Sequence, residues 1–200
     1  MKSRLIGMAT FATALSLAAP ALALAWEPSR DVQRILVSGR PWAEVLPDTN
    51  GAVLIHAAID IPAPARAVWA LMTDCRMAAR LVVTVTSCKI LSGDQQRGWD
   101  VREQVTRGNI FLPEIHNVMR NDFQPFSVIR FRKVGGNLKA EAGEWRLEPL
   151  SGGAGTRVIY VNRVAVNILA PAALVRAGLK RDTPKVLVNL RRESVAASHR

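Results

Sequence analysis

The hydrophobic pattern is clearest in the run Val53–Ile61, which is almost uncharged and rich in β-branched residues. A run of this length and composition predicts a strand. Pro62 and Pro64 end it because proline gives a sheet no hydrogen-bond donor. Pro64 also suits the first turn of a helix, where its missing N–H costs nothing. The apolar segment after it predicts a short helix ending at Thr73-Asp74, and a second helical piece follows over 76–81.

The remaining pattern predicts a meander of strands followed by one long helix. The expected strands are 82–91, 99–107, 114–121, 127–134, 138–149 and 156–166, with turns at Ser92-Gly93-Asp94 and Asn121-Asp122 among the connections. The helix is expected over 171–197, with a kink or break at Asp182-Thr183-Pro184. This order is typical of an α+β fold, in which a curved antiparallel sheet of about six to seven strands wraps a C-terminal helix.

Several of these segments resemble a known superfamily. The entry segment carries VWALMTD, and the later landmarks are GDQQRGWDVREQV, GEWRLEPL, GTRVIYVNRV and RDTPKVLVNLRRES. Together they resemble the START-like, polyketide cyclase/dehydrase helix-grip proteins, which include the coenzyme Q-binding START domains. The resemblance runs from about Gly51 to Glu193. It implies a hydrophobic cavity between the sheet and the helix that holds a lipid, quinone, polyketide or similar molecule.

The N-terminus has the layout of a secretory signal peptide. Lys2 and Arg4 precede an apolar run, and Ala23-Leu24-Ala25 is a small-x-small cleavage site. We therefore predict a signal peptide over 1–25 and a periplasmic or secreted protein, the alternative being an uncleaved anchor. N-terminal sequencing of the native protein tests this, because the mature chain should begin at Trp26.

Residues 26–50 are predicted to form a leader with a short helix over 31–37, either packed on the domain or partly mobile. The helix-grip domain itself is predicted over 51–197. Neither an internal repeat nor a low-complexity segment is evident.

The chain is strongly basic, with a formal net charge of +11. Removing Lys2 and Arg4 leaves 27 − 2 = 25 basic residues against 16 acidic ones, so the mature chain is near +9. Such a surplus favours anionic surfaces through long-range attraction. We expect no nucleic-acid partner for an exported protein, whereas an anionic membrane surface or an acidic ligand is a plausible partner.

Cys75 and Cys88 are the two cysteines of the chain. An even pair in an exported domain is most simply a disulfide, and two buried free thiols are the alternative. No histidine lies near them in sequence, and no CxxC is present. We therefore predict neither a metal site nor a cofactor. The absence of HExxH, GxSxG and P-loop motifs argues mildly against hydrolase or transferase chemistry.

Strict alternation along the strands predicts one apolar sheet face that looks towards the terminal helix. The side chains expected to bound a ligand cavity there are Trp69, Val101, Glu103, Asn117, Ile129, Phe131, Trp145, Tyr160, Asn162 and Leu187. Of these, Glu103, Asn117, Tyr160 and Asn162 are the polar groups that could orient a ligand. The first interpretation of apolar inward residues is hydrophobic core, and a pocket lining is the second. A lone acid among valines, as Glu103 is predicted to be, needs a partner, solvent or a shifted pKa.

The opposite face is predicted to be rich in arginine. The residues assigned to it are Arg102, Arg130, Arg132, Arg146, Arg157 and Arg163. Such a set is either a solvated surface paired locally with Glu144 and Glu148, or a docking face for an anionic membrane or an acidic partner.

Binding, with possible transport, of a hydrophobic small molecule is the first functional hypothesis. An aromatic cyclase or dehydratase using the same cavity is the alternative. It would need an acid–base pair, for which Glu103, His116 and Tyr160 are the candidates. A non-catalytic interaction module is the third.

Overall fold

The computed structural model describes residues 26–94, 96–108, 113–153, 155–166 and 171–199. The predicted signal peptide, residues 1–25, lies outside these residues. The strands are β1 (Trp42–Pro47), β2 (Val53–Ile61), β3 (Val85–Asp94), β4 (Trp99–Thr106), β5 (Ile115–Gln124), β6 (Val128–Gly136), β7 (Ala140–Pro149) and β8 (Thr156–Ala165). The α-helices are α1 (Arg30–Val37), α2 (Ala65–Thr73), α3 (Ala78–Leu81) and α4 (Ala172–Ser198).

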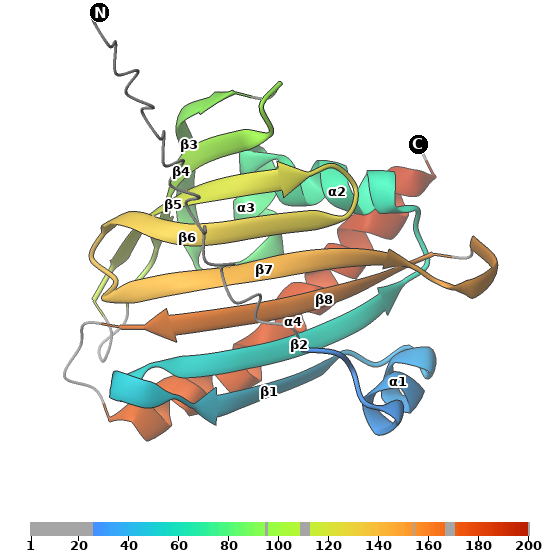
Figure 1. The fold of residues 1–200 in the computed structure, drawn as a ribbon, viewed down its shortest axis with the longest axis horizontal. Coiled ribbons are helices and arrows are strands. Elements are labelled where there is room, and N and C mark those ends of the chain that lie inside the picture. The colour runs from blue at the N-terminus through green and yellow to red at the C-terminus, as the bar shows by residue number, and fades with distance from the viewer. Residues whose placement is uncertain (1–25, 95, 109–112, 154, 167–170, 200) are drawn as a thin grey trace, which may run out of the picture.

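The strands form one curved antiparallel sheet in the order β1-β2-β8-β7-β6-β5-β4-β3 (Figure 1). The α+β helix-grip fold is confirmed, with eight strands rather than six to seven. The additional strand is β1, which pairs with β2 from within the predicted leader. Its sequence ends in Pro47, which an edge strand tolerates because one side of it needs no donors.

Two expected turns are wrong, and one helix expectation holds at most in part. β5 runs on through Asn121-Asp122, and the chain turns at Pro125-Phe126 instead, where Phe126 takes a φ of 61°. β3 likewise continues through Ser92-Gly93-Asp94. Of the kink or break expected at Asp182-Thr183-Pro184, the break is absent, because α4 is helical throughout with Pro184 inside it.

Tight packing between α4 and the sheet forms the main core. Leu187 and Leu190 of α4 are buried against Val158 of β8 and Leu147 of β7. The close backbone neighbours of α4 are β1, β2, α2 and α3. The helix therefore covers the concave face at β1 and β2, and Figure 1 shows it crossing behind the sheet.

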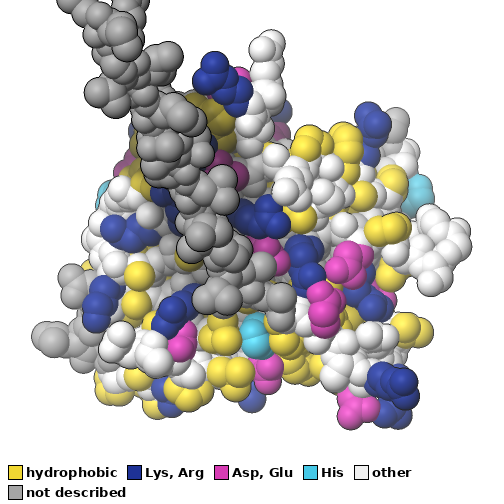
Figure 2. All heavy atoms as spheres, in the orientation of Figure 1, with side chains coloured by type: hydrophobic (Ala, Val, Ile, Leu, Met, Phe, Trp, Pro, Cys, Tyr) yellow, Lys and Arg dark blue, Asp and Glu magenta, His cyan; other side chains and the backbone are white. Residues whose placement is uncertain are grey.

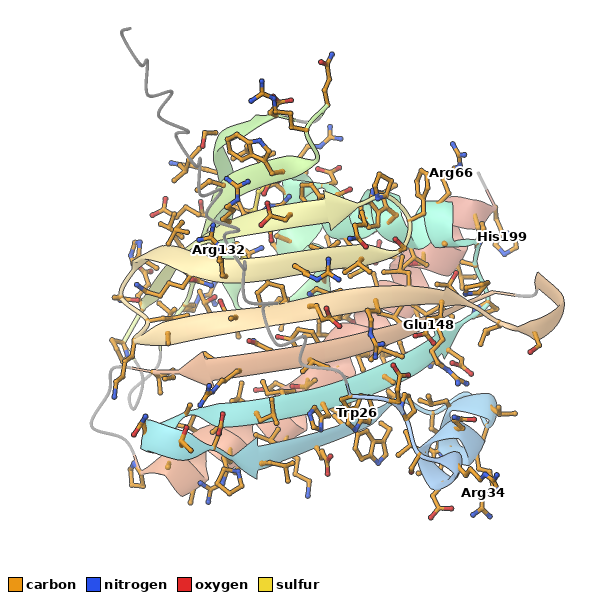
Figure 3. All side chains as sticks on the ribbon, viewed as in Figure 1. Trp26, Arg34, Arg66, Arg132, Glu148 and His199 are labelled. Carbon is orange, nitrogen blue, oxygen red and sulfur yellow. A yellow bond between two sulfur atoms is a disulfide. The ribbon has the colours of Figure 1, made fainter. Side chains whose placement is uncertain are left out.

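The leader packs on the convex face of the sheet. Leu36 of α1 is buried against Ile159 and Val161 of β8. Trp26 stacks on the Trp42 ring at 5.2 Å and on the His56 ring at 5.0 Å, in front of β1 and β2 in Figure 3. In this structure the leader is therefore packed on the domain.

A disulfide joins Cys75, in the short 3-10 helix Cys75–Met77, to Cys88 of β3, as predicted. The bridge pins the α2–α3 segment to the edge of the sheet. Closing a 13-residue separation stabilises a fold by roughly 3 kcal/mol in the loop-entropy view.

Among the described residues, no helix has both the length and the apolar character needed to cross a membrane.

Candidate functional site

Three aromatic rings line the concave face of the central strands. Tyr160 of β8 stacks on Trp145 of β7 at 3.9 Å between ring centroids, and Phe131 of β6 lies 6.2 Å from Tyr160. Gly143 makes this possible, because a Cβ there would come within 2.6 Å of the Phe131 ring. Ile129 lies beside them, opposite Trp145 in the register. The predicted inward parity of β6, β7 and β8 is confirmed.

This inner face is unevenly covered. The cross-strand pair Leu147 and Val158 is fully buried beneath α4. The next inward pair, Trp145 and Tyr160, keeps part of its surface accessible although it lies on the central strands. Side chains of α4 therefore do not cover the aromatic rings as completely as they cover the core.

Two other predicted residues lie at the edges of this region. Trp69 of α2 meets Phe123 and Phe126 edge-on, at 6.0 and 5.9 Å. Leu187 is completely buried in the core described above. Trp69 thus extends the aromatic wall towards α2, whereas Leu187 is a packing residue.

An acid does lie on the concave face, but it is the half-buried Glu141 rather than Glu103. The Glu141 carboxylate accepts a hydrogen bond from Asn162 Nδ2 at 2.9 Å and another from Asn117 Nδ2. Asn162 Nδ2 also donates to Tyr160 Oη at 2.7 Å. Asn117 and Asn162 were predicted to be polar groups of the interior, and the structure brings them together around Glu141. Extending the alternation of β7 two residues back from Gly143 would have identified it.

Burial is the main influence on the pKa values of the Glu141 carboxyl and the Tyr160 hydroxyl. It raises the pKa of the Glu141 carboxyl, and the two amide hydrogen bonds oppose the rise. A raised pKa means that ionising Glu141 destabilises the folded protein. The contribution of this carboxyl to the free energy of unfolding is therefore largest at low pH and is lost as the pH rises through the raised pKa. Burial, with the nearby Glu141 charge, also raises the pKa of Tyr160, which keeps its hydroxyl neutral. Tyr160 can therefore donate its hydroxyl proton.

The prediction that Val101 and Glu103 face the helix is wrong. In β4 the inward residues are Asp100 and Arg102, which are buried. The Asp100 carboxylate accepts from Arg102 Nε at 3.1 Å and from Asn121 Nδ2 at 2.7 Å. Two charged side chains can occupy the inner face because they neutralise one another. The sequence pattern of the strand does not show this pairing, so the apolar residues were assigned to the inner face instead.

Glu103 instead lies on the convex face beside His116. The Glu103 carboxylate is 3.7 Å from His116 Nδ1, and Glu114 is 2.8 Å from His116 Nε2. Tyr160 points to the other side of the sheet. The acid–base set proposed for a cyclase therefore does not converge on one space.

Most of the predicted arginine face is paired with acids. Arg130 and Arg146 contact Glu144, Arg157 binds Asp60 at 2.7 Å, and Arg163 binds Asp48 at 2.5 Å. Figure 2 shows basic and acidic side chains beside one another on this face. Arg102 does not belong to it, since it points inward. The pairing favours a locally neutralised surface, and docking on an anionic membrane stays a prediction.

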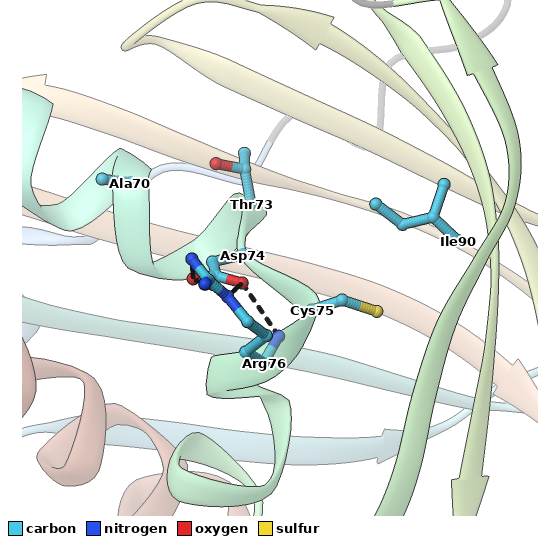
Figure 4. A pocket seen from close by; sticks show the side chains of 6 residues that line it. All are labelled: Ala70, Thr73, Asp74, Cys75, Arg76 and Ile90. Carbon is cyan, nitrogen blue, oxygen red and sulfur yellow. Dashed lines mark hydrogen bonds and ion pairs between the residues drawn. The ribbon is translucent and has the colours of Figure 1, made fainter.

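A separate hollow of about 730 Å³ opens between the end of α2 and β3 (Figure 4). Its lining residues are Ala70, Thr73, Asp74, Cys75, Arg76 and Ile90. None of the predicted ligand-contact residues lies there, and its carboxylate, Asp74, is already engaged by Arg76. The candidate ligand site is instead the concave aromatic face, where Asn162 joins the Glu141 carboxylate to the Tyr160 hydroxyl by hydrogen bonds.

The chain matches a family model described as polyketide cyclase/dehydrase and lipid transport over residues 61–191, more than half of its length. No curated protein matches it. Similar solved structures include a STAR-related lipid transfer protein from Xanthomonas axonopodis, with 13% identity over 76% of this chain and 98% of that one, at a TM-score of 0.61.

The ZhuI aromatase/cyclase from Streptomyces sp. R1128 shows 17% identity over 74% of this chain and 94% of that one, at a TM-score of 0.58. The human StarD13 lipid transfer and protein localization domain shows 13% identity over 77% of this chain and 84% of that one, at a TM-score of 0.65. These likenesses support the fold, and the family match carries the assignment. The chain belongs to the polyketide cyclase/dehydrase and lipid transport family.

Proposed function

We propose that the protein binds, and carries, a hydrophobic small molecule between the concave face of the central strands and α4. The observation that carries this proposal is the aromatic pair Trp145 and Tyr160, which stays partly accessible on the concave face beside the buried ring of Phe131. An apolar wall with a few convergent polar groups is the usual character of a small-molecule site. Family membership and the lipid-transfer proteins among the structural neighbours support it.

Binding is favoured over cyclase chemistry by the placement of the candidate acids and bases. Glu103 and His116 lie on the convex face, away from Tyr160. A reaction on a molecule inside the grip would have to proceed without them. A carrier needs only a shaped apolar space and a polar group that fixes one end of the ligand.

Thermal unfolding with added ligand tests the proposal. A short-chain ubiquinone and decanol serve as probes, because both are apolar with a small polar end. A ligand that binds only the folded state should stabilise it by about 2.7 kcal/mol at a hundredfold excess over its dissociation constant. The melting temperature of the wild type should therefore rise with at least one probe.

Replacing Trp145 with alanine should weaken that probe's binding by about tenfold or more, since the ligand loses an aromatic contact. Trp99→Ala is the matched control, because Trp99 lies on the convex face beneath Arg120. The proposal fails if no probe changes the melting temperature of the wild type, or if both variants bind as tightly as the wild type does.

A further inference from the structure

The polar groups at one end of the concave face have more acceptors than donors. Asn117 and Asn162 are buried, and their amide N–H groups are used by Glu141 and Tyr160. Their Oδ1 atoms are also buried and have no hydrogen-bond partner among the described residues. Unpartnered buried acceptors are uncommon in folded proteins and cost free energy, so each needs an explanation.

The charge of Glu141 is likewise unmatched. The partners of its carboxylate in the described part of the chain are the two amides, and no lysine or arginine there forms an ion pair with it. Elsewhere in this protein, buried acids have cationic partners, as Asp100 has Arg102 and Glu144 has Arg146. The Glu141 cluster, consisting of Glu141, Asn117, Asn162 and Tyr160, therefore lacks a donor that carries positive charge.

We propose that the Glu141 cluster binds the protonated amine head of an apolar ligand. An ammonium group offers three N–H donors, and the cluster offers the two amide oxygens and the carboxylate as acceptors. Its positive charge would neutralise Glu141 within the grip. The Tyr160, Trp145 and Phe131 rings add faces that attract organic cations. The assignment deepens the proposed function, on which it rests.

The same groups should reject an anionic head. A carboxylate ligand would meet the Glu141 charge and two amide oxygens, with the Tyr160 hydroxyl as the donor it could use. An alcohol would be intermediate, because it can donate one hydrogen bond and accept one from Tyr160. Head-group preference therefore separates this proposal from unspecific burial of an alkyl chain.

Isothermal titration of the wild type with decylamine, decanol and decanoate tests the preference at pH 7. The three probes share one chain length, so the apolar contribution is matched, and a primary amine is protonated at this pH. We expect decylamine to bind about tenfold or more tightly than decanol, and decanoate to bind weakest, since hydrogen bonds to charged groups are the stronger ones.

Glu141→Gln should then weaken decylamine binding by about tenfold to a hundredfold while leaving decanol within a few-fold. Glu148→Gln is the matched control, because Glu148 lies on the convex face of the same strand and should leave both affinities unchanged. Circular dichroism establishes that both variants fold.

If a variant does not fold, the order of the three probe affinities for the wild type tests the amine site on its own. Decanol or decanoate binding as tightly as decylamine would overturn the amine site and leave the proposed function standing. Binding of none of the three probes would overturn both. Equal loss of decylamine and decanol affinity in a folded Glu141→Gln protein would show a role in packing and also overturn the amine site.

Discussion

Replacing Arg102 with methionine is expected to lower the free energy of unfolding by about 3–5 kcal/mol, because it leaves the buried Asp100 carboxylate without its cation. Arg102 also donates to the Thr73 carbonyl at 3.3 Å, so the change removes one hydrogen bond between the sheet and the end of α2. Urea unfolding followed by circular dichroism measures the effect.

Arg132→Met is the matched control, since Arg132 is exposed on the convex face, where Figure 3 labels it. Surface substitutions of this kind usually stay within about 0.5 kcal/mol. A double replacement, Arg102→Met with Asp100→Asn, should recover much of the loss because it also removes the unpaired charge. An unfolding midpoint for Arg102→Met equal to that of Arg132→Met would contradict the assignment of Arg102 to the interior.

The second large effect is expected from Leu187→Ala. Leu187 is fully buried between α4 and the sheet, and a leucine-to-alanine change at such a site costs about 2–5 kcal/mol, depending on how far the cavity collapses. The same urea titration measures the loss.

Leu174→Ala on the same helix is the control, because Leu174 is 57% exposed. It should change the free energy of unfolding by less than about 0.5 kcal/mol. Equal unfolding midpoints for the two variants would contradict the burial of Leu187 between α4 and the strands β7 and β8.

The fold and the inward-facing residues of β6, β7 and β8 could be predicted because polar and apolar positions alternate sharply in these segments. In β6 and β7, arginines and glutamates alternate with Ile129, Phe131 and Trp145, so the inward parity is unambiguous. The cysteine pair and the position of α4 followed from similarly plain signals.

The failures have physical causes. β4 was assigned to the wrong parity because Asp100 and Arg102 are buried as a mutually neutralising pair, and a sequence pattern shows charges without their partners. The inward position of Glu141 follows from the alternation of β7, but its hydrogen bonds could not be predicted because its partners, Asn117 and Asn162, come from other strands. β1 was missed because its six residues lie among turn-forming prolines.

A crystal structure of the protein soaked with a short-chain ubiquinone or decylamine tests the central claim most directly. The claim is that a ligand binds between the central strands and α4. Electron density for the probe against Trp145 and Tyr160, with its polar end at Glu141 or Asn162, is the predicted result. Density confined to the hollow beside Ala70 and Ile90, with the concave face filled by the protein's own side chains, would contradict it.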